Sequence, residues 1–87
     1  MIDEIIGLLK SEITKYVPGV TCYNSSYSVI VCKGKNHEFS IFVHDDGQGG
    51  CSVWCNGAGF VVFDVYDPEF IIKIINYVSN SVRKYHE

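Results

Sequence analysis

The fold of this chain is decided by residues 27–44, which have the sequence YSVIVCKGKNHEFSIFVH. Two runs rich in Val, Ile and Phe flank a short polar break at Gly34-Lys35-Asn36. Branched and aromatic residues favour strands, and a short break that contains glycine favours a hairpin turn. The stretch therefore predicts two antiparallel strands near 27–33 and 37–44.

Three further strands are predicted on either side of this hairpin, near 20–24, 51–55 and 60–65. The segments between them consist of turn residues such as Ser, Asp, Asn and Gly. All of these segments are short, and short connections join neighbouring antiparallel strands. The sequence thus predicts a four- to five-stranded antiparallel meander.

A helix is predicted at each end of the chain. Residues 2–17 place apolar side chains at the i, i+3, i+4 spacing of an amphipathic helix, and Pro18-Gly19 ends it. Near the other end, Asp67 is the predicted N-cap of a second helix, with Pro68 in its first turn and Glu69 at its positive end. An apolar stripe then continues through the last part of the chain.

The predicted fold class is α+β, with residues 1–87 forming one domain. Short connections at both helix junctions favour two helices on the same face of the sheet, which gives a two-layer sandwich. A chain of 87 residues has room for one core only.

Pairing apolar residues across the predicted turns fixes a register for each pair of strands. It sets Val31 opposite Phe39, Phe42 opposite Val53, and Trp54 opposite Val61. The predicted core face is almost entirely apolar and consists of Val29, Val31, Phe39, Ile41, Val43, Ser52, Trp54, Val61, Phe63 and Val65. The opposite face is mixed and consists of Ile30, Cys32, Glu38, Ser40, Phe42, His44, Cys51, Val53, Cys55, Phe60, Val62 and Asp64.

This mixed face has no cover if both helices lie on the core face. A contiguous exposed apolar patch on a small protein marks an interaction surface. The predicted partner-binding residues are Ile30, Phe42, His44, Val53, Phe60 and Val62.

The four cysteines and three histidines raise the question of metal binding and catalysis. Cys51 and Cys55 share one predicted strand, about 13 Å apart at the strand rise, which is too far to hold one tetrahedral ion. His44 falls opposite Cys51 in the predicted register, but no helix N-terminus or obvious orienting acid accompanies the pair. We therefore predict free thiols, no metal, no cofactor and no catalytic residue.

The net charge and the first residues of the chain bear on which class of partner it binds and on where the protein is located. The net charge is −3 and the lysines are scattered, whereas nucleic-acid binders carry a basic patch. The acidic start, Met1-Ile2-Asp3-Glu4, does not resemble a secretion signal, and no apolar stretch is long enough to span a membrane. The expected location is the cytoplasm, and the expected partner is a protein.

The leading functional hypothesis is a non-catalytic protein-binding module that docks, or forms a homo-oligomer, through the open sheet face. Ten Ile against two Leu, with many Asn, Lys, Phe and Tyr, indicates an AT-rich genome. This favours a phage or mobile-element inhibitor of a host enzyme or defence nuclease. The alternatives are an oligomeric small-ligand or nucleotide-binding protein that uses the Asp45–Gly50 loop and His44, and an enzyme that uses His44 and Cys51.

Overall fold

The computed structural model describes residues 2–35, 37–48 and 50–86. The chain forms, in order, α1 (Ile2–Tyr16), β1 (Thr21–Ser26), β2 (Val29–Lys33), β3 (Glu38–Asp45), β4 (Cys51–Cys55), β5 (Val61–Asp64) and α2 (Phe70–His86). The five strands pair in chain order, and each pair is antiparallel. The predicted α+β meander with a helix at each end is confirmed.

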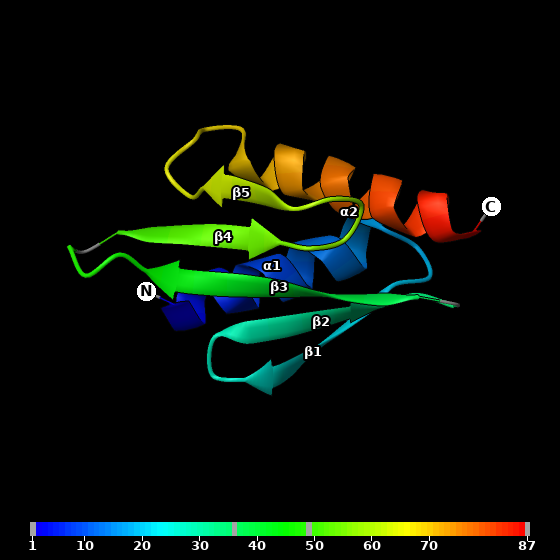
Figure 1. Ribbon diagram of the computed structural model, residues 1–87, viewed down its shortest axis with the longest axis horizontal. Helices are drawn as coiled ribbons and strands as arrows, with labels where there is room; N and C mark the ends of the chain where they lie inside the picture. Colours follow the sequence, from blue (N-terminus) through cyan, green and yellow to red (C-terminus); the bar gives the residue numbers. More distant parts are fainter. Residues whose placement is uncertain (1, 36, 49, 87) are drawn as a thin grey trace.

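Both helices lie behind the sheet in the view of Figure 1. α1 packs against β1, β2 and β3, α2 packs against β5, and the helices contact each other. The sheet therefore has one covered face and one open face. Within the described residues, neither helix combines the length and apolar character needed to cross a membrane.

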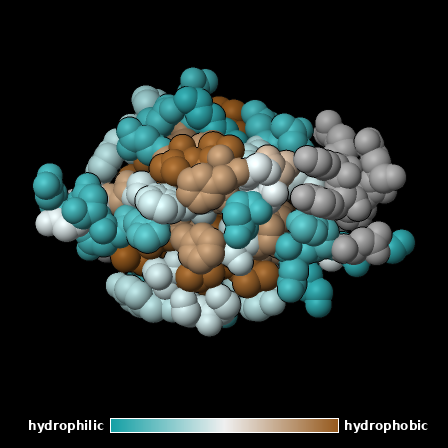
Figure 2. Space-filling model, viewed as in Figure 1, coloured by the Kyte–Doolittle hydropathy of each residue, from teal (hydrophilic) through white to brown (hydrophobic). Residues whose placement is uncertain are grey.

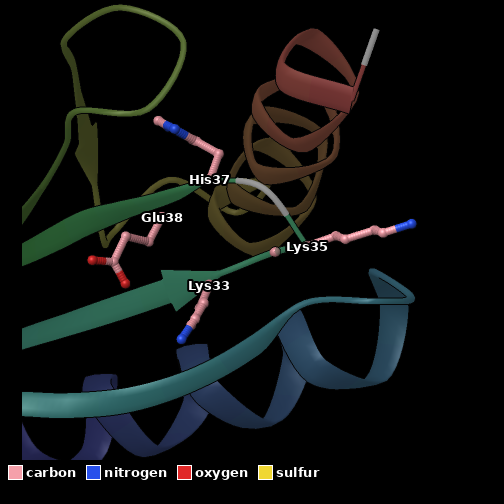
Figure 3. Close-up of a pocket in the computed structure, with 5 residues that line it drawn as sticks. Lys33, Lys35, His37 and Glu38 are labelled. Carbon is pink, nitrogen blue, oxygen red and sulfur yellow. The ribbon is translucent and has the colours of Figure 1, made fainter.

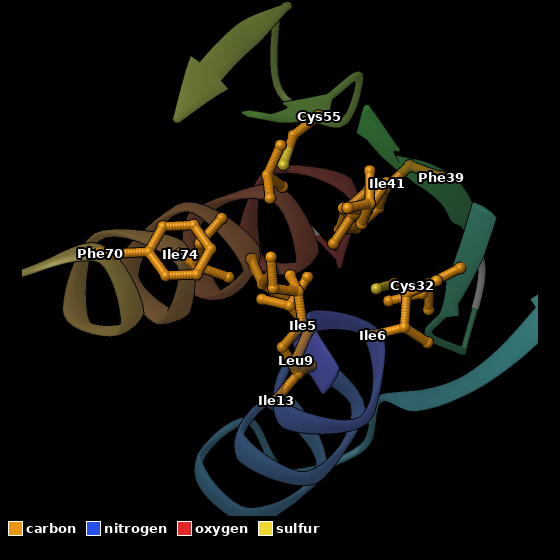
Figure 4. Packing of buried hydrophobic residues seen from close by; sticks show 14 of the residues in the cluster. Ile5, Ile6, Leu9, Ile13, Cys32, Phe39, Ile41, Cys55, Phe70 and Ile74 are labelled. Atoms are coloured by element: carbon orange, nitrogen blue, oxygen red, sulfur yellow. The ribbon is translucent and has the colours of Figure 1, made fainter. Parts of the chain in front are cut away.

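The core fills the space between the sheet and the two helices (Figure 4). The helices contribute Ile5, Ile6, Leu9, Ile13, Phe70, Ile74 and Val78. The sheet contributes Ile30, Cys32, Phe39, Ile41, Val43, Cys51, Val53 and Cys55. Three of the four cysteines thus serve as small apolar side chains of the core.

The register between β2 and β3 differs by one residue from the prediction. Val31 lies opposite Ser40, and not opposite the neighbouring Phe39 as apolar pairing suggested. The reason is the turn, which holds four residues, 34–37, instead of three. A displacement of one residue turns every side chain of a strand to the other face. The predicted faces of β2 are therefore exchanged.

The next two registers are also displaced by one residue. Trp54 lies opposite Phe42 on β3 and opposite Val62 on β5, whereas the prediction paired Val53 with Phe42 and Val61 with Trp54. The displacement between β3 and β4 exchanges the faces of β4, and the displacement between β4 and β5 restores the predicted faces at β5. As a result β3 and β5 face as predicted, while the faces of β4 are exchanged.

Two predicted partner-binding residues are placed wrongly for this reason. Ile30 on β2 and Val53 on β4 were expected on the open face, but both are fully buried in the core. Conversely Val29, Val31 and Trp54, which were expected in the core, belong to the open face.

Asp67 caps α2 as predicted. Its Oδ1 accepts a hydrogen bond from the backbone N–H of Glu69 at 2.8 Å, and its carbonyl accepts one from the N–H of Phe70 at 2.9 Å. The Lys73 ammonium, one turn into the helix, forms an ion pair with the same carboxylate. The hydrogen bond from Lys73 and that from Glu69 hold the pKa of Asp67 below its usual value.

We expect Asp67→Ala to lower the melting temperature by a few degrees at neutral pH. The pKa of Asp67 is depressed in the folded state, so its stabilising effect is present above the unfolded-state pKa. That effect is lost as the pH falls through the folded-state pKa. Melting curves of both proteins should therefore converge in acid. Asp67→Asn, which retains the cap but not the ion pair, should fall between them, and equal melting temperatures at neutral pH would argue against the cap.

Candidate functional site on the open sheet face

The open face carries one continuous apolar row that crosses four strands. Val29 lies opposite Phe42, Phe42 opposite Trp54, and Trp54 opposite Val62. Val29 and Phe42 are half-buried, whereas Trp54 is 36% and Val62 50% exposed. Figure 2 views this face and shows apolar side chains gathered at its middle, between hydrophilic margins.

An aromatic cluster stands at the centre of this row. The His44 ring lies 4.3 Å from the Trp54 ring, and the Phe60 ring meets Trp54 edge-on at 5.6 Å. The indole Nε1 donates a hydrogen bond to Ser52 Oγ at 2.8 Å. Trp54 is thus held between two rings with its polar atom satisfied, and docking would immobilise little additional side-chain freedom.

The turn that carries Phe60 is fixed to the rest of the protein by hydrogen bonds. Asn56 Oδ1 accepts a bond from the N–H of Ser40 on β3 at 2.9 Å. Ala58 N–H donates to Ser81 Oγ on α2 at 3.0 Å, and the Tyr77 hydroxyl donates to the Gly59 carbonyl at 2.5 Å. These bonds hold Phe60, which is 63% exposed, against the Trp54 ring.

Charge is confined to the margins of the open face. The central row of Val29, Phe42, Trp54 and Val62 is uncharged. Lys33 and Glu38, which have opposite charges, face each other at one end. A face of this kind lacks the cationic contacts that bind phosphate groups.

The predicted partner-binding residues divide between the two sides of the sheet. Phe42, His44, Phe60 and Val62 occupy the open face and surround Trp54. Ile30 and Val53 do not. Trp54, the centre of the cluster, escaped the sequence prediction because the displaced register assigned it to the core.

The structure does not form the predicted pairing of His44 with Cys51. His44 lies opposite Ser52 and is exposed on the open face, whereas Cys51 lies opposite Asp45 and is buried in the core. Cys55, the other cysteine of β4 in the core, is held in its thiol form, since burial raises its pKa to about 12. Among residues 2–35, 37–48 and 50–86, no cluster of three His, Cys, Asp or Glu side chains is arranged to hold a metal ion.

The backbone N–H groups of residues 46–48 and 50, in the loop after β3, are hydrogen-bonded within the loop itself. Asp45 Oδ1 accepts a hydrogen bond from the N–H of Gly47 at 2.8 Å. Asp46 Oδ1 accepts bonds from Gln48 at 2.7 Å and Gly50 at 3.0 Å. The two carboxylates therefore accept the hydrogen bonds of the backbone N–H groups that an anion would need, and their negative charges would repel it. This arrangement stabilises a hairpin loop.

A small hollow at the β2–β3 turn is lined by Lys33, Gly34, Lys35, His37 and Glu38. Its labelled side chains point in different directions (Figure 3). Lys33, which shares the open face of the sheet with Glu38, and Lys35, which extends away from the turn, point in different directions. Because the cationic groups diverge, they do not form a common site for an anion.

A second apolar surface lies on the helical side of the protein. It is a shallow groove between α1 and α2, lined by Glu12, Tyr16, Ile71, Ile72, Ile75 and Asn76. Ile72 is 59% exposed there. The groove has no aromatic cluster comparable to that around Trp54, and its position allows the two surfaces to be tested separately.

Comparison of the chain with protein-family models, with curated proteins and with solved structures finds no match. The open sheet face is therefore the feature on which a function can be argued.

Proposed function

We propose that this chain is a non-catalytic protein-binding domain whose open sheet face is the interface. The observation that carries the proposal is the uncharged apolar row centred on Trp54, with Phe60 and His44 packed against it. From the exposed fractions of these side chains we estimate roughly 400 Å² of apolar surface on this face. An area of that size lies within the roughly 300–600 Å² of the largest apolar patch on a monomer, a patch that is often functional. It is about half of the roughly 800 Å² that each partner buries in a standard interface, so surrounding residues would be covered as well.

The chemistry of the face favours one kind of partner. A protein surface with an apolar centre and few charges would bury the row without leaving a charge unpaired. Trp54 and Phe60 are the natural anchors, since aromatic residues at the centre of an interface contribute most of its binding energy. His44, Ser52 and Asp64 would form part of a polar rim.

The same proposal includes the inhibitory role suggested by the composition. Blocking a host enzyme or defence nuclease requires only that a small domain bind tightly, and it requires no chemistry of its own. An apolar face fixed by hydrogen bonds is suited to this task, because little conformational freedom is lost on binding.

We expect Phe60→Lys to weaken association at least about tenfold without unfolding the protein. Phe60 is 63% exposed, so a lysine there remains solvated in the free protein but would be desolvated in the complex. Sedimentation over a range of concentrations measures self-association. Retention of proteins from host lysate on immobilised chain measures binding to another protein. Trp54 is the only tryptophan, so quenching of its fluorescence reports on coverage of this face.

Ile72→Lys is the matched control. It replaces a side chain of similar exposure, 59%, in the helical groove, and it should leave association unchanged. If Phe60→Lys changes the sedimentation, the partner on this face is a second copy of the chain. If it changes the retention, the partner is a different protein. Equal behaviour of the wild type and a folded Phe60→Lys in both measurements would refute the proposed interface.

A further inference from the structure

A pair of cysteines lies across the first two strands of the sheet. Cys22 on β1 is the direct cross-strand partner of Cys32 on β2, and their Sγ atoms are 3.7 Å apart in a thiol hydrogen bond. Directly opposed residues in antiparallel strands have Cα atoms about 4.5–5.5 Å apart, which lies within the range that a disulfide spans. Only a small approach of the two sulfur atoms separates the thiol pair from a bond.

The two cysteines of the pair differ in their exposure to solvent. β1 is the edge strand of the sheet, and Cys22 is half-buried there. Cys32 is fully buried beside Ile6 of α1 (Figure 4). A dissolved oxidant would therefore react with Cys22 first, and Cys32 would react only with the modified Cys22.

The surroundings of Cys22 favour its thiolate. The hydrogen bond from Cys32 lowers the pKa of Cys22, and burial opposes this effect in part. A hydrogen bond with Thr14 and the charge of Lys10 lower the pKa further. Lys10 is held near β1 because its Nζ donates to Asn24 Oδ1 at 2.8 Å. The thiolate is the nucleophile in disulfide exchange, so Cys22 is the attacking group of the pair.

We propose that Cys22 and Cys32 are a modification site at which the two side chains form a reversible disulfide with each other. The oxidant is a small-molecule disulfide such as oxidised glutathione. The Cys22 thiolate attacks one sulfur of the reagent, whose disulfide bond breaks and releases one thiolate. The Cys32 sulfur then attacks Cys22 Sγ, and the second glutathione leaves. Two protein thiols are oxidised, one reagent disulfide is reduced to two thiols, and the two thiol protons pass to the departing thiolates.

The other two cysteines cannot form an equivalent bridge. Cys51 and Cys55 project to the core from one strand, about 13 Å apart at the strand rise. They therefore serve as internal standards for the reaction.

The test is treatment of the folded protein with excess oxidised glutathione, followed by unfolding, alkylation and mass spectrometry. We expect the mass to fall by two hydrogens before alkylation. Two alkylated cysteines, Cys51 and Cys55, should replace the four of the reduced protein, and a peptide map should link Cys22 to Cys32. The melting temperature of the oxidised protein should rise by at least about 4 °C and return after reduction with dithiothreitol, since the bridge constrains the unfolded chain.

Two variants complete the test. Cys22→Ser removes the half-buried thiol of the edge strand and should abolish the bridge and the rise in melting temperature. Cys51→Ala, the matched control, should still form the bridge. Four alkylated cysteines in the treated wild type, a glutathione adduct that persists on Cys22, or a bridge between other cysteines would each overturn the proposal.

Discussion

Ile30→Lys is expected to unfold the protein, whereas Val31→Lys, one position later on β2, is expected to leave it folded. Ile30 is fully buried among the side chains that face the helices. A lysine there would be an unpaired charge in the core, at a cost of about 3–5 kcal/mol or more against a total stability of roughly 5–15 kcal/mol. Val31 is half-buried on the open face, where a lysine can extend its ammonium to water.

Circular dichroism and chemical denaturation distinguish the two variants. The pair forms its own control, because both substitutions replace a branched apolar residue of the same strand with the same cation. The register inferred from sequence alone predicts the reverse result, with Val31 in the core and Ile30 on the open face. A folded Ile30→Lys together with an unfolded Val31→Lys would show that the register of β2 in the structure is wrong.

The elements themselves were predictable because each has a strong local signal. Pro18-Gly19 ends α1, and Asp67 begins the capped turn of α2. Glycine-containing turns separate β2, β3, β4 and β5 as predicted, and short turns leave the meander as the simplest topology. These features depend on residues close together in the chain, which is why the sequence alone was sufficient. The first turn lies at Tyr27-Ser28, two residues later than the break expected between strands near 20–24 and 27–33, because β1 continues through Ser26.

The faces of β2 were not predictable in the same way. Val29, Ile30, Val31 and Cys32 are all apolar, so the strand has no alternation to indicate which side is buried. The assignment then depended on the length of one turn, and four residues instead of three reversed it. Alternation is stronger in β3, where Glu38 and Ser40 alternate with Phe39 and Ile41, and the core face of that strand was predicted correctly.

The sequence therefore predicted only some of the residues of the candidate interface. Phe42 and Phe60 were placed on the open face because β3 and β5 face as predicted. Trp54 was missed because the register inferred from apolar pairing, displaced by one residue, assigned it to the core face and its neighbours Val53 and Cys55 to the open face. Those two side chains fit beneath the helices, and the indole ring lies outside, where His44 and Phe60 support it.

Gly57→Ala is expected to destabilise the protein by about 1–3 kcal/mol. A Cβ atom at Gly57 would lie 2.6 Å from Ser81 Oγ, 3.0 Å from Ser81 Cβ and 3.2 Å from Phe39 Cδ2. Ser81 is fully buried, and its hydroxyl accepts the hydrogen bond from Ala58. Rotating the hydroxyl away would break that bond and still leave the contact with Ser81 Cβ, so the turn itself must move.

Gly7→Ala provides the matched control with the opposite sign. Gly7 is exposed on α1, and a Cβ there would meet nothing within 4 Å, so the change should stabilise the protein by about 0.5–1 kcal/mol through helix propensity. Chemical denaturation of both variants gives the two free energies of unfolding. The turn at Gly57 also positions Phe60 against Trp54, so folded Gly57→Ala should show altered Trp54 fluorescence, whereas Gly7→Ala should not. If Gly57→Ala were as stable as the wild type and had unchanged fluorescence, the close packing of this turn on α2 would not be what holds the aromatic cluster in place.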